Sequence, residues 1–206
     1  FMRSGSIATI ALAITGAGMA GFLMLRIKDH VAKRFSAWGH IWEDVWDSGY
    51  QQTHALSAGA SGGLFGKGAG NGWLKDTFAG NTDTVFGVMC EELGLIIAIC
   101  AVLAILALTF FAVRNSGHGR SAYYSIAACA TATMFMAQVA LNVFGSVDIL
   151  PFTGVTFPFV SRGGTSVLAC WMLLAFIKAG DTRKGASFVV SSPEAQTKKM
   201  REAEKA

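Results

Sequence analysis

Residues 81–95 read Asn-Thr-Asp-Thr-Val-Phe-Gly-Val-Met-Cys-Glu-Glu-Leu-Gly-Leu and place Asp83, Glu91 and Glu92 directly before a long apolar run. That run, residues 93–113, holds 21 residues without a charge, and a helix needs about 20 apolar residues to span a bilayer. Carboxylates are costly inside hydrocarbon, so they lie at an interface or in a water-filled cavity. Glu91 and Glu92 therefore either mark the membrane surface or, together with Asp83, form an acidic catalytic site at the outer face.

The composition excludes an ordinary soluble domain. Of 206 residues, 52% are hydrophobic and 15% are charged, and the mean hydropathy is +0.46. These values predict a small polytopic membrane protein or a part of a larger one. Much of the net charge of +4 lies near the C-terminus, which is typical of a cytoplasmic tail rather than of nucleic-acid binding.

The cysteines and histidines predict no structural metal. The four histidines are dispersed, and the four cysteines lie in or beside apolar segments. Their spacing fits neither a zinc site nor a disulfide framework, and buried small hydrophobic residues are the simpler interpretation.

Four apolar segments predict an all-α polytopic transmembrane bundle, with spans at residues 1–25, 93–113, 122–147 and 165–178. A signal peptide is the competing interpretation of the first segment. A span is favoured because the apolar run is too long for a signal core and no small-x-small cleavage site follows. Before the last span, Pro151 and Pro158 interrupt any continuous helix and predict a partly re-entrant loop at 148–164.

Basic residues in the connections predict the orientation. The link 114–121 holds two arginines and no acid, and Arg3 and the tail 179–206 are also basic. The positive-inside rule places these segments in the cytoplasm, with both termini. The long segment 26–92 and the loop 148–164 then lie outside and must meet over the outer mouth of the bundle.

The large outer loop carries two further patterns. Trp38, Trp42 and Trp46 are four residues apart, which predicts one helical stripe that anchors an amphipathic segment on the outer leaflet. Direct substrate contact is the less favoured alternative. The glycine-rich segment 62–72 is either a flexible turn or a phosphate-binding loop, and it lacks the Lys-Ser/Thr ending of a nucleotide P-loop.

The order of these motifs resembles the SEDS family (shape, elongation, division and sporulation; FtsW/RodA/SpoVE-like) over about residues 5–180. The motifs are residues 34–46, Gly49-Tyr-Gln-Gln52, residues 62–68, Thr82-Asp83, Glu91-Glu-Leu-Gly94, Gln138, Asn142, and Leu150-Pro-Phe-Thr-Gly-Val-Thr-Phe-Pro-Phe-Val-Ser-Arg-Gly-Gly-Thr-Ser166. Two positions depart from the family pattern: Thr84 stands where a Phe is usual, and Arg162 where a Tyr is usual.

The resemblance implies a peptidoglycan glycosyltransferase of the bacterial cytoplasmic (inner) membrane that polymerises lipid II and works with a class B penicillin-binding transpeptidase. Family members have ten spans, and this chain resembles the last four, so the resemblance also implies a missing N-terminal membrane half. A lipid-linked precursor flippase component and a non-catalytic scaffold of the division machinery are the alternatives. Ionisable groups gathered outside, with few polar groups at mid-depth, favour chemistry at the outer face.

The resemblance also implies roles for single residues. Asp83 matches the family's essential aspartate, and it would take a proton from the attacking sugar hydroxyl or position that hydroxyl. Stabilisation of the pyrophosphate leaving group falls to cations and N–H groups. For the pyrophosphate the candidates are Arg34, Lys67, the backbone of residues 62–72 and a divalent cation (Mg or Mn). The full set of substrate-binding candidates is Arg34, Lys67, Gly66, Gly68, Ser161, Arg162, Gly163 and Gly164. Arg162 could instead pair with Asp148. Glu91, Glu92, Gln138 and Asn142 are expected to support the site. The alternative for the two glutamates is that they pair with a basic residue from another helix.

Overall fold

The computed structural model describes residues 7–27, 29–77, 80–116 and 122–180. Within these ranges the chain is helical and has no strand. Most of the predicted link 114–121 and of the predicted tail 179–206, with Arg3, lies outside the described residues. The elements are α1 (Ile7–Ile27), α2 (Asp29–Ala37), α3 (Tyr50–Gly62), the 3-10 helix η1 (Leu74–Asp76), α4 (Val85–Glu92), α5 (Leu95–Ser116), α6 (Ala122–Ser146) and α7 (Gly164–Gly180).

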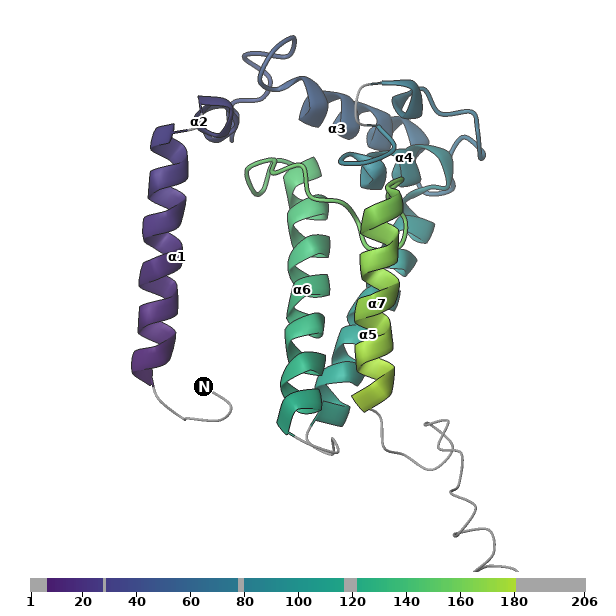
Figure 1. The fold of residues 1–206 in the computed structure, drawn as a ribbon. Coiled ribbons are helices and arrows are strands. Elements are labelled where there is room, and N and C mark those ends of the chain that lie inside the picture. Colours follow the sequence, from purple (N-terminus) through teal and green to yellow (C-terminus); the bar gives the residue numbers. More distant parts are fainter. Residues whose placement is uncertain (1–6, 28, 78–79, 117–121, 181–206) are drawn as a thin grey trace, which may run out of the picture.

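Helices α5, α6 and α7 pack into a bundle (Figure 1). Small side chains let the helix backbones approach closely: Ala98 and Ala112 of α5 and Ala132 of α6 are buried. Phe135 of α6 is fully buried at the centre and packs in the same cluster as Cys170 of α7.

The outer surface of this bundle is apolar. In the most apolar 18-residue stretch of each helix, 17% is buried in α5 and 33% in α6. A core helix of a soluble protein would be mostly buried. Leu103, Phe110 and Trp171 are all more than half exposed, as expected of side chains that face lipid. Both α5 and α6 are long and apolar enough to cross a membrane, while α1 and α7 carry shorter apolar stretches. The prediction of an all-α polytopic membrane protein is confirmed.

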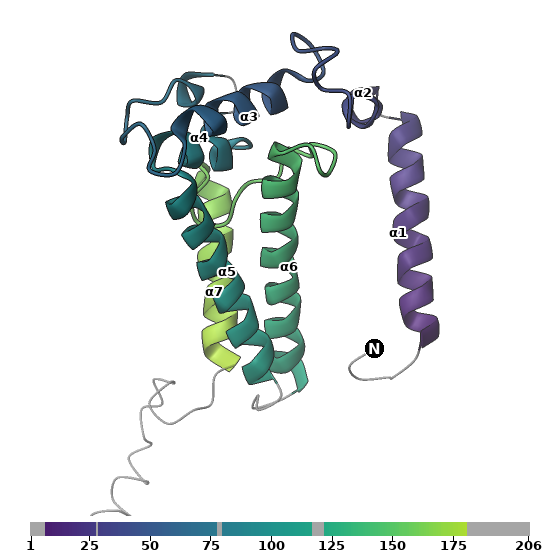
Figure 2. The ribbon, with the colours of Figure 1, turned by 180° about the vertical axis from the view of Figure 1, so that it is seen from behind.

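Helix α1 stands apart from the bundle in both views (Figures 1 and 2). It contacts α2, and every side chain of α1 that the structure describes is exposed. Averaged over its length, α1 is about as hydrophobic as α5. The whole circumference of α1 is therefore open to lipid or to other membrane helices.

Helices α2, α3 and α4 and the loop 147–163 gather at one end of the bundle (Figures 1 and 2). This is the end at which α5 begins and α6 ends. As the two prolines predict, residues 147–163 form no helix, and α7 begins at Gly164. These three helices and this loop together form a polar cap on the apolar bundle.

The predicted helical stripe of three tryptophans is wrong. Helix α2 ends at Ala37, and turns follow because Gly39 adopts a left-handed backbone with φ of +78°. The three indoles consequently have different surroundings. Trp38 Nε1 donates a hydrogen bond of 3.2 Å to the carbonyl of Ile149, whereas Trp42 is 63% exposed and Trp46 is 84% exposed.

Candidate functional site

Asp83 lies in the turn that leads into α4, and its backbone is tied to two other segments. The side-chain amide of Asn142, in α6, donates hydrogen bonds of 2.9 Å to the carbonyl of Asp83 and 2.7 Å to the carbonyl of Val155. Asn142 is 1% exposed. A buried polar group that bridges two carbonyls holds both segments firmly, because breaking either bond removes a partner from the buried amide of Asn142.

The loop before α7 adds a second set of ties to the same turn. The hydroxyl of Ser161 donates to the carbonyl of Thr82 at 2.7 Å and accepts from the N–H of Phe157 at 2.8 Å. The backbone N–H of Arg162 donates to the carbonyl of Asn81 at 2.8 Å. The turn 81–83 therefore lies along the loop 155–162, and the Ser161 hydroxyl serves to fix it.

Arg34, from α2, faces Asp83 across Gly154. A Cβ atom on Gly154 would lie 3.0 Å from Nη1 of Arg34 and 3.0 Å from Oδ2 of Asp83, so the two charged groups are at most twice that distance apart. Arg34 is held there by Phe152: Nη1 donates to its carbonyl at 3.4 Å, and the guanidinium lies 5.5 Å from the ring centroid. Among the described residues, the ion pairs within 4.0 Å involve Lys67 and Lys75, so the nitrogens of Arg34 and the oxygens of Asp83 lie more than 4.0 Å apart. This separation beside Gly154 is the polar gap between the two charged groups.

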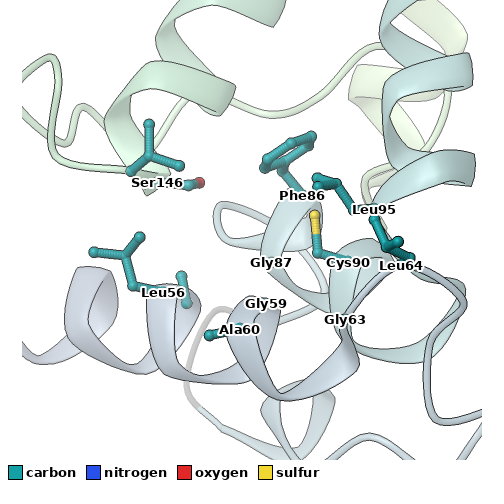
Figure 3. Close-up of a pocket in the computed structure, with 12 residues that line it drawn as sticks. Leu56, Gly59, Ala60, Gly63, Leu64, Phe86, Gly87, Cys90, Leu95 and Ser146 are labelled. Carbon is teal, nitrogen blue, oxygen red and sulfur yellow. The ribbon is translucent and has the colours of Figure 1, made fainter.

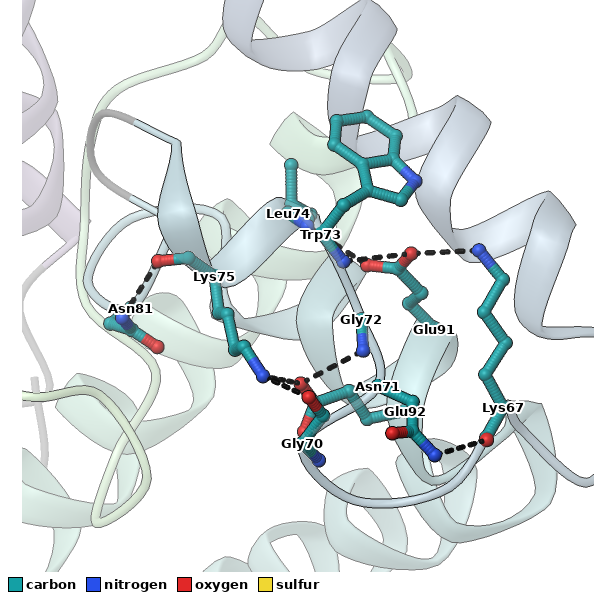
Figure 4. A network of polar contacts seen from close by, with 10 residues as sticks. All are labelled: Lys67, Gly70, Asn71, Gly72, Trp73, Leu74, Lys75, Asn81, Glu91 and Glu92. Atoms are coloured by element: carbon teal, nitrogen blue, oxygen red, sulfur yellow. Dashed lines mark hydrogen bonds and ion pairs between the residues drawn. The ribbon is translucent and has the colours of Figure 1, made fainter.

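The glycine-rich segment wraps the carboxylate of Glu91 (Figure 4). Glu91 is fully buried and accepts from Lys67 Nζ at 2.9 Å, from the N–H of Trp73 at 3.2 Å and from the N–H of Leu74 at 3.1 Å. Burial raises the pKa of Glu91, but the hydrogen bonds from Lys67, Leu74 and Trp73 outweigh it, and the pKa lies below its ordinary value. The carboxylate is thus charged and satisfied by its own chain.

Glu92 is bound in the same manner beside it (Figure 4). Its two oxygens accept from the N–H groups of Gly70 at 2.9 Å and Gly72 at 3.3 Å, and Lys75 Nζ lies 3.4 Å from Oε1. The hydrogen bond from Gly70 is the largest influence that holds the pKa of Glu92 below its ordinary value. The basic partner of Glu92, Lys75, lies in the 3-10 helix η1, whereas that of Glu91, Lys67, lies in the glycine-rich segment.

The predicted site residues therefore fall into two networks at opposite ends of α4. Asp83, Arg34, Asn142 and Ser161 meet at its start. Glu91 and Glu92 bind the glycine-rich segment at its end, and a helix of eight residues is about 12 Å long. The N–H groups of Lys67 and Gly68 donate to the carbonyls of Glu91 and Glu92, and that of Gly66 to the carbonyl of Gly62. In this structure the glycine-rich loop binds carboxylates of its own chain.

The remaining predicted residues lie near the first network. The Arg162 side chain is exposed, and Gly163 and Gly164 follow it at the start of α7. Asp148 accepts from Gln52 at 3.2 Å and from the N–H of Gly39 at 3.2 Å, so it is engaged by partners other than Arg162.

Gln138 lies one helical turn from Asn142. Its Oε1 atom and the Oδ1 atom of Asn142 are buried with no hydrogen-bond partner. Two buried acceptors one helical turn apart on α6 thus have spare hydrogen-bonding capacity.

Three residues with a part in these networks were not singled out from the sequence: Gln52, Lys75 and Gly154. Gln52 is buried and joins the end of α6 through the carbonyl of Gly145, at 3.1 Å. Its place in the Gly-Tyr-Gln-Gln motif was the available signal. Gly154 has φ of +71°, and its position between two prolines in an apolar loop gave no hint of a role beside Asp83.

A separate apolar cavity of about 380 Å³ lies on the side of α4 that faces α3 and the end of α6 (Figure 3). Leu56, Phe86, Cys90 and Ser146 are among its lining residues. Burial raises the pKa of the Cys90 thiol to about 11, so this thiol is protonated at neutral pH and is a poor nucleophile. The cavity offers hydrophobic contact rather than chemistry.

No group of three or more His, Cys, Asp or Glu side chains suited to a metal ion occurs in the described part of the chain. Among the described residues, the first network contributes one carboxylate, that of Asp83.

Comparison with known proteins identifies the class. The family model described as "Cell cycle protein", that of FtsW, RodA and SpoVE, matches residues 1–184, and the chain belongs to this SEDS family of membrane proteins. The probable peptidoglycan glycosyltransferase FtsW of Lactococcus lactis is 35% identical over 77% of this chain and 39% of its own length. The protein of the same name from Escherichia coli O6:H1 is 34% identical over 88% of this chain and 46% of its own length.

The peptidoglycan glycosyltransferase RodA of Mycobacterium tuberculosis H37Rv is 32% identical over 73% of this chain and 32% of its own length. The chain thus spans between about a third and about a half of the length of the curated relatives that it matches.

Proposed function

We propose that this chain is the catalytic-loop part of a peptidoglycan glycosyltransferase that polymerises lipid II for cell-wall elongation or division. The family and the names of the relatives support the class of reaction. The observation that supports the site is the polar gap at Gly154, where Asp83 and Arg34 face one another. The two groups supply the two functions that glycan transfer requires.

The proposed chemistry assigns one function to each side chain. The attacking sugar hydroxyl forms a bond to the anomeric carbon of the second substrate and loses its proton to the Asp83 carboxylate. The bond from that carbon to the lipid pyrophosphate breaks, and the electron pair leaves with the pyrophosphate. Arg34 stabilises the developing negative charge, as a guanidinium does for phosphate oxygens. Asn142 and Ser161 keep the Asp83 turn in place during this step.

We also propose how the chain is oriented in the bacterial cytoplasmic membrane. Residues 1–25, 93–113, 122–147 and 165–178 span the bilayer, and both termini lie in the cytoplasm. The large loop 26–92 and the loop 148–164 lie outside, where lipid-linked substrate is used. The partners would be lipid II, a class B penicillin-binding transpeptidase and the further membrane spans that the longer relatives contain.

A flippase is the weaker candidate for the described spans. Translocation of a sugar pyrophosphate needs polar groups through the bilayer. Thr109, Ser116 and Thr133 instead bond to carbonyls of their own helices. Charged groups of the described residues are concentrated at the capped end of the bundle, which supports chemistry there.

The test uses a chimera in which the N-terminal part of the Escherichia coli relative is joined to this chain. The chimera is reconstituted in liposomes with lipid II and a transpeptidase whose active site is blocked. Polymeric glycan on a gel supports the glycosyltransferase. Transfer of labelled lipid II between leaflets without polymer would support the flippase instead, and neither activity from a folded chimera would support the scaffold.

A further inference from the structure

A polar cavity of about 460 Å³ lies between α2 and the start of α3. Arg34 and its neighbour Lys33 line it from α2, and Trp46, Asp47 and Tyr50 are among the residues that line it from the other side. Its volume lies within the range of about 300–1,000 Å³ that is usual for small-molecule sites. Of the residues in the first network, Arg34 alone lines this cavity.

The lining of this cavity offers the groups that bind a sugar. Trp46 is 84% exposed, so its indole offers an open apolar face against which the C–H face of a pyranose ring can stack. Asp47, Ser48 and Gln51 offer acceptors and donors for sugar hydroxyl and acetamido groups. The charged residues of the lining are two cations, Lys33 and Arg34, and one carboxylate, Asp47, so charge alone does not exclude a phosphate, and the open indole of Trp46 is the feature that favours a sugar.

The three tryptophans of residues 38–46 have different surroundings, which allows sugar binding by one of them to be tested against the others. Trp38 is fixed by its hydrogen bond to the carbonyl of Ile149. Trp42 is 63% exposed but does not line the cavity, whereas Trp46 does. Trp42 is therefore a matched control for Trp46: the same side chain, four residues away, on the same run of turns.

Arg34 connects the cavity to the first network. It lines the cavity, and its Nη1 atom faces Asp83 across Gly154. A saccharide chain in the cavity would thus have one end beside the carboxylate.

We infer that this cavity is a saccharide subsite, which binds an N-acetylated amino-sugar unit of the glycan strand next to the Asp83 centre. This inference rests on the proposed function for the identity of the sugar, and it deepens that function by naming where the strand is held. Trp46 stacks on the ring, and Asp47 and Gln51 bond to its polar groups.

The experiment measures binding of N-acetylchitotetraose, a soluble lipid-free probe, to the purified chain in detergent by isothermal titration calorimetry. The wild type and Trp42→Ala are expected to bind with affinities equal within about twofold, and Trp46→Ala is expected to weaken binding by at least about tenfold. Gln51→Ala gives a second variant and is expected to weaken binding several-fold. No saturable binding by the wild type, or equal binding by Trp46→Ala, would overturn the subsite.

The same titration separates this inference from the proposed function. A chimera that polymerises lipid II while the chain fails to bind the probe would remove the subsite alone. Probe binding that depends on Trp46, with no polymer from the folded chimera, would keep the subsite and remove the polymerase.

Discussion

The side-chain amide nitrogen of Asn142 lies 2.9 Å from the main-chain carbonyl oxygen of Asp83 and donates a hydrogen bond to it. The same nitrogen donates to Val155 at 2.7 Å. One buried residue of the helix bundle therefore sets the relative positions of the turn before α4 and the loop before α7. The carboxylate that we propose as the base is positioned from inside the bundle.

Replacement of Asn142 by Ala should reduce both stability and activity. Two part-buried carbonyls lose their donor, and the cost of each is at or below that of a fully buried unsatisfied group, about 1–3 kcal/mol. A lower melting temperature of the chain in detergent and a polymerisation rate of the chimera reduced by at least about tenfold are the expected results. Gln138→Leu is the control, since the buried Oε1 of Gln138 has no partner, and its melting temperature in detergent should be unchanged or higher. A destabilisation by Gln138→Leu as large as that by Asn142→Ala would contradict the bridging role.

Replacement of Gly154 by Ala should affect activity more than stability. The left-handed backbone costs a non-glycine residue about 1–2 kcal/mol, and the added methyl group would press on both Arg34 and Asp83. The rate of the chimera should fall at least about tenfold while the protein stays folded. Gly145→Ala, whose added carbon meets Phe152 at an ordinary 3.6 Å, should keep its rate within about twofold. Equal rates for the two variants would show that the gap at Gly154 is not the reaction site.

Replacement of Glu91 by Gln should destabilise the capped end of the bundle more than replacement of Glu92 by Gln. The Glu91 side chain is fully buried, and its loss leaves the Lys67 ammonium unpaired, whereas Glu92 is 14% exposed. Breaking a buried pair typically costs about 3–5 kcal/mol and breaking an exposed pair about 0–1 kcal/mol. Both lysines are partly exposed, at 33% and 28%, so both losses should fall between these limits, with that of Glu91 the larger. Thermal unfolding of the two variants in detergent measures this difference. A larger loss of thermal stability in Glu92→Gln than in Glu91→Gln would contradict this prediction.

The hydrogen bonds that hold the glycine-rich segment against Glu91 and Glu92 should be lost at low pH. The pKa values of Glu91 and Glu92 are both lowered from the ordinary 4.5, so the fold favours their charged forms. Their stabilisation is complete above the ordinary value and is lost as the pH falls through the lowered values. Hydrogen exchange of the amides of residues 70–74, corrected for its intrinsic pH dependence, should show protection that is constant above about pH 5 and falls below about pH 4. The double variant Glu91→Gln, Glu92→Gln should lack this transition, and a transition near neutral pH in the wild type would disprove the assignment.

The fold class could be predicted from the sequence because its determinants are local. An uncharged run such as 93–113 has one stable form in a membrane, and two prolines exclude a helix across 148–164. The tryptophan stripe failed because spacing alone cannot show that the left-handed backbone of Gly39 ends the helix.

The site could be predicted only in part. Motif resemblance selected Asp83 and Arg34, which the structure brings together. The partner of Lys67 could not be predicted, because a glycine-rich loop can bind a phosphate or a carboxylate equally well through its N–H groups. Which anion it binds depends on Glu91, 24 residues further along the chain.

The role of Asp83 is tested most directly by steady-state kinetics of lipid II polymerisation by the chimera, with Asp83→Asn beside the wild type. Asparagine keeps the shape of the side chain and the carbonyl that Asn142 binds, and it removes the base. We expect kcat to fall by about 10²–10⁴-fold, with KM within about threefold and an unchanged melting temperature. A folded Asp83→Asn protein that forms polymer at a rate within about twofold of the wild type would contradict catalysis by Asp83.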